Sequence, residues 1–360
     1  MLLEPDTAQI GRFANIATAR SGDLFVSDLS GGRVLRFGRD GSLRMTIGRS
    51  GSGPGELRGP TQPALVNDDS VLVVMDPRSS ALSLFDVRNG GFLRRVQTPF
   101  REPGHRWTFA GDTAVFGLTF SSATLARWPV PDDSVTTVGA VDPRLSQSGP
   151  VFLNYGKTEV VPHGEAYLAA VPTVPGLQVL NSAGRTIARV DLPPRGRRGI
   201  PPDLIERHMA DQRDGKPFQY RASVVADLAT LTDGYFAVIW VDLDLINNER
   251  PEPSNARFFV SLLSPDLGRA CIDIPFRVAS DTPLPFPGFS GDTIVAFARQ
   301  ILPNGRLRSV VYRYALNRDD CQWIETGGAK PVGVGPGTAS LRSRPQRSWL
   351  AAASPSAKGP

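Results

Sequence analysis

The sequence lacks a hydrophobic run long enough to cross a bilayer. Its longest uninterrupted apolar run covers residues 235–241. A membrane-spanning helix needs roughly 20 apolar residues, so we expect no transmembrane segment. The start of the chain, MLLEPDTAQIGRF, also lacks a basic region followed by a long apolar core. No signal peptide is therefore expected in this chain, and the sequence leaves the cellular location open.

Cysteine and histidine are scarce, with two and three residues respectively among 360. No His-x-x-x-His or Cys-His set has the spacing of a zinc site. Cys271 and Cys321 each begin the last strand of consecutive repeats. Equivalent strands of neighbouring units should lie beyond the roughly 7 Å Cα limit for a disulfide. We therefore predict two free thiols, with a bridge between them as the alternative.

Catalytic signatures are missing as well. No serine stands in a nucleophile-elbow context, and nothing in the sequence nominates a catalytic residue. The stretch GRSGSGPGE (48–56) has four glycines, but it contains no lysine, and Pro54 and Pro60 oppose the helix that a phosphate-binding loop requires. We interpret it as a Gly-rich crossing between sheets. The sequence thus favours a protein that is not an enzyme, while leaving an enzyme open.

Charge of one sign is not in large excess. The 40 basic and 35 acidic residues give a net charge of +5, part of which lies in the C-terminal tail, so no nucleic-acid-binding domain is indicated. Glycine and proline, in contrast, are abundant, with 36 and 32 residues. Their abundance favours many turns over long helices.

A pattern of turns and short apolar strands recurs six times. Its clearest copy is residues 22–48, GDLFVSDLSGGRVLRFGRDGSLRMTIG, where Asp-Gly and Gly-Gly turns separate strand-like runs. Successive copies start roughly 43 to 69 residues apart, which is typical of propeller blades with insertions. The copies start at Gly22, Asp68, Gly111, Gly164, Asp233 and Gly291.

Several of these strands, such as TAVFGLTF and YFAVIWV, are apolar on both faces. Such strands belong to sheets that are covered on both sides. We therefore predict an all-β fold, a six-bladed β-propeller of four-stranded antiparallel blades packed face to face around an axis. CQWIE (321–325) is expected to be the last strand of blade 6. Five or seven blades also fit, because the fifth repeat is long.

The propeller is expected to cover residues 13–325. Residues 1–12 form an N-terminal segment in which AQIG (8–11) echoes MTIG (45–48), so this segment is a possible closing strand for blade 6. Residues 326–360 are rich in Gly, Pro, Ala and Ser and are predicted to be a disordered tail. A short helix is expected in the blade 4–5 crossing, where Pro201 and Pro202 suit first-turn positions.

Residues 22–42 resemble the NHL repeat, whose unit has Asp-Gly, a VxD strand, an arginine-containing strand ending in Phe, and another Asp-Gly. Residues 48–60 resemble that family's Gly-rich connection into the next blade. The combination is most similar to bacterial six-bladed β-propeller proteins related to NHL repeats, over residues 10–98. The resemblance implies a soluble repeat protein that is commonly exported, hence periplasmic if the N-terminus is truncated.

The resemblance also implies RNA binding as a candidate function, because RNA binding is known among NHL-type propellers. The aromatic side chains that single-strand binders interleave with basic ones are few here, Phe218 and Tyr220. We therefore expect no nucleic-acid partner.

Loop lengths differ between the two faces of the predicted disc. In an antiparallel blade the first-to-second and third-to-fourth turns share one face, and these turns are all tight. Loops much beyond about 12 residues are usually functional or disordered. We therefore place the function on the opposite, long-loop face, around the central channel. Its long segments are residues 48–60, 139–156, 193–220, 242–255 and 276–289.

The predicted ligand-binding residues are polar and aromatic side chains near these loops. Three of them open the innermost strand of blade 3, at the channel mouth, and others belong to the longest loop or flank it. Further basic residues of that loop, Arg195, Arg197, Arg198, Arg213 and Lys216, suit a small anionic ligand, a glycan, a peptide or an acidic protein. The predicted set is His105, Arg106, Trp107, Arg207, His208, Tyr220 and Trp240.

Two pairs of carboxylates are candidates for a calcium site. Asp242 and Asp244, two apart in WVDLDL, would point to one face of a strand. Asp28 and Asp76 end their strands in VSD and VMD and would ring the axis, as in lactonase-type propellers. Alternatively, Asp28 and Asp76 bond turn amides or the arginine of the repeat. We predict a non-catalytic binding propeller without a cofactor, the alternative being a Ca-dependent hydrolase or lactonase-like propeller with an axial metal.

Overall fold

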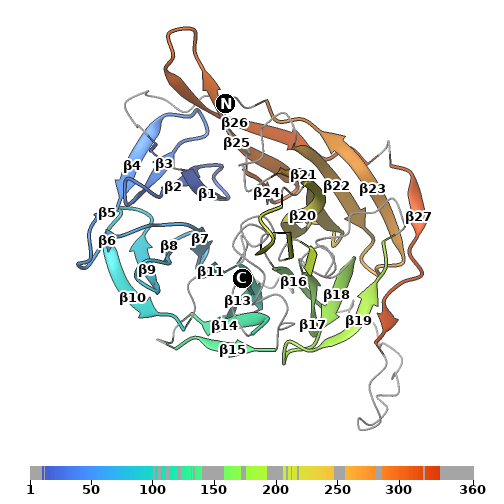
Figure 1. Ribbon diagram of the computed structural model, residues 1–360. Coiled ribbons are helices and arrows are strands. Elements are labelled where there is room, and N and C mark those ends of the chain that lie inside the picture. The colour runs from blue at the N-terminus through green and yellow to red at the C-terminus, as the bar shows by residue number, and fades with distance from the viewer. Residues whose placement is uncertain are drawn as a thin grey trace, which may run out of the picture.

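Tight turns divide the chain into short strands. Gly22, Gly41 and Gly90 have φ of 87°, 84° and 70°, a left-handed conformation that glycine adopts without steric cost. Each turn reverses the chain, so that the next strand pairs antiparallel to the one before. The resulting sheets surround a central axis in a six-bladed β-propeller (Figure 1), which confirms the predicted fold class.

This computed structural model describes the greater part of the propeller. Among its described residues, no helix is long and apolar enough to cross a membrane. The described residues are 10–11, 13–99, 102–103, 107–110, 113–119, 123–130, 132, 134–139, 158–171, 176–192, 206–207, 210–211, 213–216, 219–246, 256–279, 286–318 and 321–332.

Blades 1 and 2 are four-stranded meanders. Blade 1 contains β1 (Phe13–Thr18), β2 (Leu24–Asp28), β3 (Arg33–Phe37) and β4 (Leu43–Ile47). Blade 2 contains β7 (Pro63–Val66), β8 (Val71–Asp76), β9 (Ala81–Asp86) and β10 (Phe92–Gln97). The Gly-rich stretch between them forms the short parallel pair β5 (Arg49–Ser50) and β6 (Glu56–Leu57), so it is a crossing between blades, as predicted.

Blades 3 and 4 repeat this plan with one added strand each. Blade 3 contains β11 (Glu102–Pro103), β12 (Thr108–Ala110), β13 (Thr113–Thr119), β14 (Leu125–Pro129) and β15 (Thr136–Val138). Both β11 and β12 pair with β13. Blade 4 contains β16 (Glu159–His163), β17 (Ala166–Ala170), β18 (Leu177–Leu180), β19 (Thr186–Val190) and an outer strand, β28 (Lys330–Pro331).

Blades 5 and 6 depart most from the repeat. Blade 5 contains β20 (Gln219–Thr230), β21 (Phe236–Ile246), β22 (Arg257–Leu263), β23 (Arg269–Phe276) and an outer strand, β27 (Trp323–Glu325). Within the described residues, blade 6 has three strands, β24 (Phe286–Ser290), β25 (Thr293–Ile301) and β26 (Leu307–Ala315).

The core lies between the blades. Phe25 and Ile47 of blade 1, for example, pack against Leu72 and Phe85 of blade 2, and all four side chains are buried. Because each sheet has a neighbour on both faces, its central strands are buried along their whole length, as the pattern of β2 shows. The apolar runs without alternation are explained by this packing.

The final described segment, residues 321–332, does not complete blade 6. We name it the C-terminal strap. Its strand β27 pairs with β23 through Cys271 and Trp323, and β28 pairs with β19. The prediction that CQWIE is the fourth strand of blade 6 is therefore wrong. The Trp323 ring lies 5.6 Å from that of Tyr235, and it packs against the core that blades 5 and 6 share.

The cysteines are not free thiols. Cys271 and Cys321 form a disulfide, and their Cα atoms are 5.6 Å apart. The sequence analysis expected a large distance between the two Cα atoms because it assigned Cys321 to blade 6. Because the strap lies beside β23 in the sheet of blade 5, the two residues are neighbours instead.

The strap also changes the expected start of the disordered tail. Thr326 N–H donates to Gly268 O at 2.9 Å, and Val332 N–H donates to Ile187 O at 3.1 Å. Lys330 Nζ pairs with Asp191 Oδ2 at 2.9 Å. Residues 326–332 are thus attached to blades 5 and 4, and the rest of the tail lies outside the described residues.

Ile10 sits where blade 6 meets blade 1. It is buried against Val295 and Val311 of blade 6 and Leu35 of blade 1, much as Ile47 is buried between blades 1 and 2. The rest of the proposed closing strand, from Ala8, lies outside the described residues. Closure of blade 6 by the N-terminal segment therefore stays a prediction.

Candidate functional site

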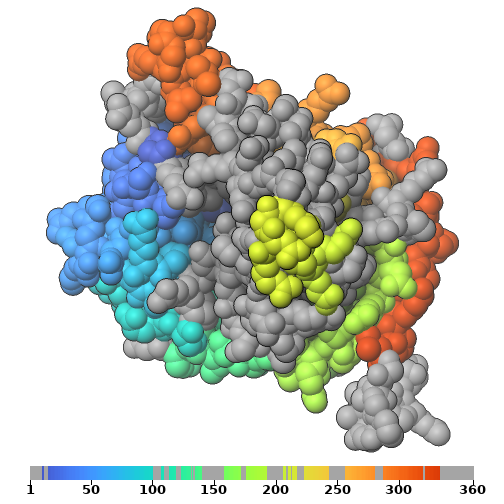
Figure 2. All heavy atoms as spheres, in the orientation of Figure 1, coloured from blue at the N-terminus to red at the C-terminus, as the bar shows by residue number. Residues whose placement is uncertain are grey.

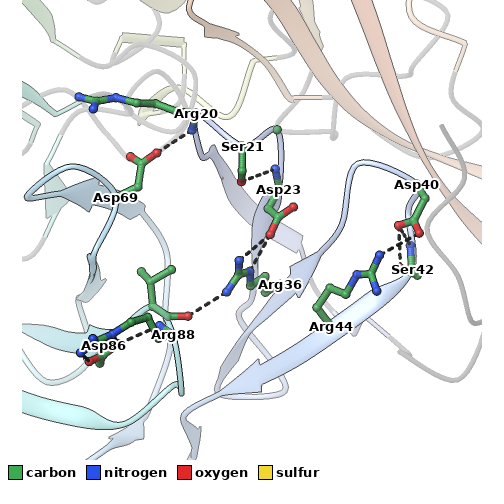
Figure 3. A network of polar contacts seen from close by, with 12 residues as sticks. Arg20, Ser21, Asp23, Arg36, Asp40, Ser42, Arg44, Asp69, Asp86 and Arg88 are labelled. Carbon is green, nitrogen blue, oxygen red and sulfur yellow. Dashed lines mark hydrogen bonds and ion pairs between the residues drawn. The ribbon is translucent and has the colours of Figure 1, made fainter.

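The tight-turn face is held together by polar contacts between blades. Arg36 of β3 donates to Asp23 Oδ2 at 2.8 Å and to Val87 O of blade 2 at 2.9 Å. Arg20 N–H donates to Asp69 Oδ2 at 2.6 Å, again from blade 1 to blade 2 (Figure 3). These side chains fasten neighbouring blades to one another, so they serve as structural contacts on this face.

The long-loop face carries a segment over its centre. The described residues of 206–216, which belong to the crossing from β19 to β20, form the yellow patch over the middle of the disc (Figure 2). The predicted helix falls partly on undescribed residues, but Glu206, Arg207 and Ala210 are helical, and Asp214 N–H donates to Ala210 O at 3.0 Å. This segment therefore lies where an axial ligand would approach.

The described part of this segment is not a one-sided basic rim. Lys216 Nζ pairs with Asp214 Oδ2 at 2.8 Å. Arg207 and Arg213 are exposed, and Glu206 is exposed beside them. Its three basic residues are therefore matched by three acidic ones, Glu206, Asp211 and Asp214. Arg195, Arg197 and Arg198 lie outside the described residues.

A two-stranded ribbon extends blade 5 on the same face. β20 and β21 pair from Thr230↔Phe236 to Gln219↔Ile246, whereas β22 begins only at Arg257, opposite Asp242. Residues 219–222 and 243–246 therefore pair with each other beyond β22. The predicted loop over 242–255 thus begins as strand, because the apolar alternation of WVDLDL continues β21.

Two predicted ligand-binding residues belong to the core. Trp240 is 1% exposed and packs between blades 4 and 5 with Leu168 and Val238. Trp107 is 8% exposed, and its ring lies 4.5 Å from that of Phe116. Both rings are therefore packed in the core, and their assignment to a ligand site stays a prediction. The physical reason for this packing is that both faces of each blade are covered by neighbours.

The other predicted ligand-binding residues are only partly placed. Arg207 is exposed in the segment over the axis. Tyr220 lies on β20, opposite Leu245, in the extended ribbon. His105, Arg106 and His208 lie outside the described residues, so their grouping stays a prediction.

Asp242, a predicted metal ligand, has both carboxylate oxygens engaged. Ser223 Oγ donates to Asp242 Oδ1 at 2.6 Å, and Arg257 Nη2 lies 3.7 Å from Oδ2. Asp244 lies two residues further along β21, opposite Arg221. Within the described part of the chain, no three His, Cys, Asp or Glu side chains gather in an arrangement suited to a metal ion.

Asp28 bonds the turn amides and an arginine of the repeat, as one of the two interpretations held. Its carboxylate accepts from Gly11 N, Gly31 N and Arg33 Nε at 3.1, 3.0 and 3.1 Å. Asp76 Oδ2 similarly accepts from Arg58 N and Ser79 Oγ, both at 2.8 Å. These carboxylates connect the second strand of a blade to the loops around it.

Sequence reasoning missed Asp227, which ties two inner strands together. Its side chain on β20 is buried, with Oδ1 accepting from Leu228 N at 2.9 Å and Oδ2 accepting from Phe289 N of β24 at 2.6 Å. The available signal was a single acid within the apolar stretch SVVADLATL. A carboxylate in such a run must find partners, because an unpaired buried charge is costly.

No protein-family model matches the chain, and no curated protein matches it. A member of the DUF4221 family from Bacteroides vulgatus is similar, with a TM-score of 0.57 and 9% identity over 88% of this chain and 96% of that one. A protein from Bacteroides fragilis has a TM-score of 0.52 and 11% identity over 83% and 82%. Virginiamycin B lyase from Staphylococcus aureus has a TM-score of 0.46 and 9% identity over 88% and 87%. At these identities the first two show the propeller fold alone, and the third supports no conclusion.

Proposed function

We propose that this chain is a non-catalytic binding propeller whose partner contacts the long-loop face around the axis. The observation that carries the proposal is the asymmetry of the disc. The described residues of 206–216 and the ribbon of β20 and β21 rise from the long-loop face, whereas the described turns of the opposite face are short, and several are tied to a neighbouring blade. Elaborated loops on a rigid scaffold are where binding residues concentrate.

The chemistry of the carboxylates supports binding over metal-dependent hydrolysis. A calcium site needs several oxygens free to coordinate the ion. Asp28 and Asp242 instead accept hydrogen bonds from the chain itself, and each faces an arginine side chain. These geometries favour a structural role for both carboxylates.

The charge of the segment over the axis favours a protein or peptide partner over a small anion. Arg207 and Arg213 alternate with Glu206, Asp211 and Asp214, so the described surface presents both signs. Mixed charge gives orientation and specificity to a macromolecular contact, whereas capture of a small anion needs converging positive charge.

The relation to NHL repeats belongs to the same proposal. It is supported by the contact between Asp28, the last residue of the VxD strand, and Arg33, the first residue of the arginine-containing strand, at 3.1 Å. In blade 1 this contact joins the two sequence features on which the resemblance depends.

The proposal is tested by replacing residues 195–216 with a short Gly/Ser linker. The wild-type chain and the variant are applied to peptide and glycan arrays, and any ligand bound by the wild type is measured in solution. We expect the variant to remain folded and to lose binding. Retained affinity in the folded variant would place the binding surface elsewhere.

The matched control changes the opposite face. Asp40 and Arg44 form an exposed ion pair on the tight-turn face, 3.0 Å apart, so Asp40→Asn with Arg44→Gln should bind like the wild type. The hydrolase alternative is tested separately by elemental analysis and by the shift in melting temperature on adding Ca²⁺. Stoichiometric calcium with a clear shift would favour the alternative.

A further inference from the structure

The hairpin of β25 and β26 is longer than the blade that contains it. Its strands pair over nine positions, from Thr293↔Ala315 to Ile301↔Leu307. Phe297 and Val311 are the outermost of its residues in the core that blade 6 shares with blade 1. Ala298 and Val310 are still buried, and Arg299 donates to Ile10 O and Gly11 O. Beyond these residues the hairpin leaves the body of the protein and forms the orange projection past the outline of the disc (Figures 1 and 2).

The tip of this hairpin is apolar and exposed. Ile301 and Leu307 face each other across the two strands, and they are 54% and 48% exposed. The described residues include only four large hydrophobic side chains with such exposure, the others being Leu93 and Ile187. Half of this exposed apolar set is therefore concentrated at one projecting tip.

The hairpin is also uniformly basic. Residues 293–315 contain four arginines and no aspartate or glutamate. Arg306 is exposed in the tip, next to Leu307. Arg308 follows on β26, and its Nη2 donates to Gln300 Oε1 at 2.6 Å, which directs its charge along the same hairpin. The exposed apolar tip of this hairpin is therefore flanked by cations.

We propose that the tip of the β25–β26 hairpin docks onto an anionic lipid bilayer. A stable protein interface needs about 800 Å² from each partner, which a narrow two-stranded tip does not supply. Docking onto a bilayer requires less contact area. A few apolar side chains enter the boundary of the acyl chains, while nearby cations attract the anionic headgroups. The exposed pair Ile301 and Leu307, with Arg306 and Arg308 beside it, has that arrangement.

The proposal concerns a different surface from the one that binds the partner in the proposed function, so either can fail alone. Its test uses the full chain and vesicles of phosphatidylcholine with or without phosphatidylglycerol. We expect the protein to co-sediment with the anionic vesicles and to be released by salt, because screening weakens the headgroup attraction. Absence of binding to anionic vesicles at low salt would overturn the proposal.

Two variants locate the binding surface. Ile301→Ser with Leu307→Ser should reduce the vesicle partition constant at least tenfold, and Arg306→Gln should reduce it about fivefold, the effect of one cation near an anionic surface. All three positions are exposed, so the fold should persist, as circular dichroism will show. Leu93→Ser, at a side chain that is 51% exposed on blade 2, is the matched control and should bind like the wild type. If the control lost as much vesicle binding as the tip variants, the assignment of the membrane-binding surface to the hairpin would be overturned.

Discussion

Cys271 of blade 5 is covalently joined to Cys321 of the C-terminal strap, although 50 positions separate them in the sequence. All three described strands of blade 6 lie between the two cysteines. The disulfide therefore closes a loop that contains the described sheet of blade 6 and anchors its C-terminal end to the outer edge of blade 5. Arg318, just before the bridge, reinforces this anchor by pairing with Asp233, and its guanidinium lies 4.8 Å from the Tyr235 ring.

Removing the bridge is expected to lower the free energy of unfolding by up to about 4 kcal/mol, the chain-entropy value for a loop of roughly 50 residues. The measurement compares denaturant unfolding of the wild type with and without a dithiol reductant. The double variant Cys271→Ala, Cys321→Ala should be less stable than the oxidised wild type and indifferent to the reductant. Two titratable thiols in the unreduced, denatured protein would contradict the bridge.

The strap also shows where sequence reasoning reaches its limit. The turns of blades 1 and 2 could be located because Asp-Gly and Gly-Gly dictate a local chain reversal, and Gly41 does adopt φ 84°. The partner of CQWIE could not be located, because any open edge accepts a short apolar strand. Its docking on β23 depends on contacts distant in sequence, such as that of Trp323 with Tyr235.

Replacing Asp28 is expected to destabilise the protein strongly. Asp28→Ala removes a side chain that is 1% exposed and leaves two amide donors and Arg33 without their acceptor. The expected cost is about 3 kcal/mol, in the range for breaking one side of a buried charged contact. Denaturant unfolding measures it. A variant as stable as the wild type that had lost calcium binding would favour the axial metal site instead.

Asp40→Ala is the comparison for this change. Asp40 bonds Ser42 and Arg44 at the surface, and these hydrogen bonds hold the pKa of its carboxyl below its usual range. Because the group is exposed, solvent replaces its partners, and we expect stability to be nearly unchanged.

The candidate site was less predictable than the fold. Trp240 was assigned to a ligand because it flanks the long loops, but it stands in YFAVIWV, the most apolar run of the chain. That run itself indicates a strand covered on both sides. The balance of charge over the axis could have been predicted, since Glu206, Asp211 and Asp214 stand among the basic residues of the same stretch and Asp214 is only two positions from Lys216.

Trp240→Ala is therefore expected to destabilise the protein by about 3 to 5 kcal/mol, as for other large-to-small changes in a core. Trp240→Phe should cost less, because it retains most of the packed volume. Unfolding by denaturant distinguishes the two. A full loss of ligand binding with unchanged stability in Trp240→Ala would support the assignment of Trp240 to the binding site.

The last prediction concerns pH. Burial lowers the pKa of His163, whose ring packs edge-on at 5.4 Å from Phe236 of blade 5. The unfolded chain takes up a proton near pH 6.5 at this residue, whereas the folded protein resists protonation there. Its contribution to stability is therefore present above about pH 6.5 and is lost as the pH falls towards the folded-state pKa. The difference in unfolding free energy between the wild type and His163→Gln should shrink over that range, and the imidazole signal missing from the variant's NMR spectrum should titrate below pH 6.5 in the wild type. A signal that titrates at or above that value would show that burial does not govern this histidine.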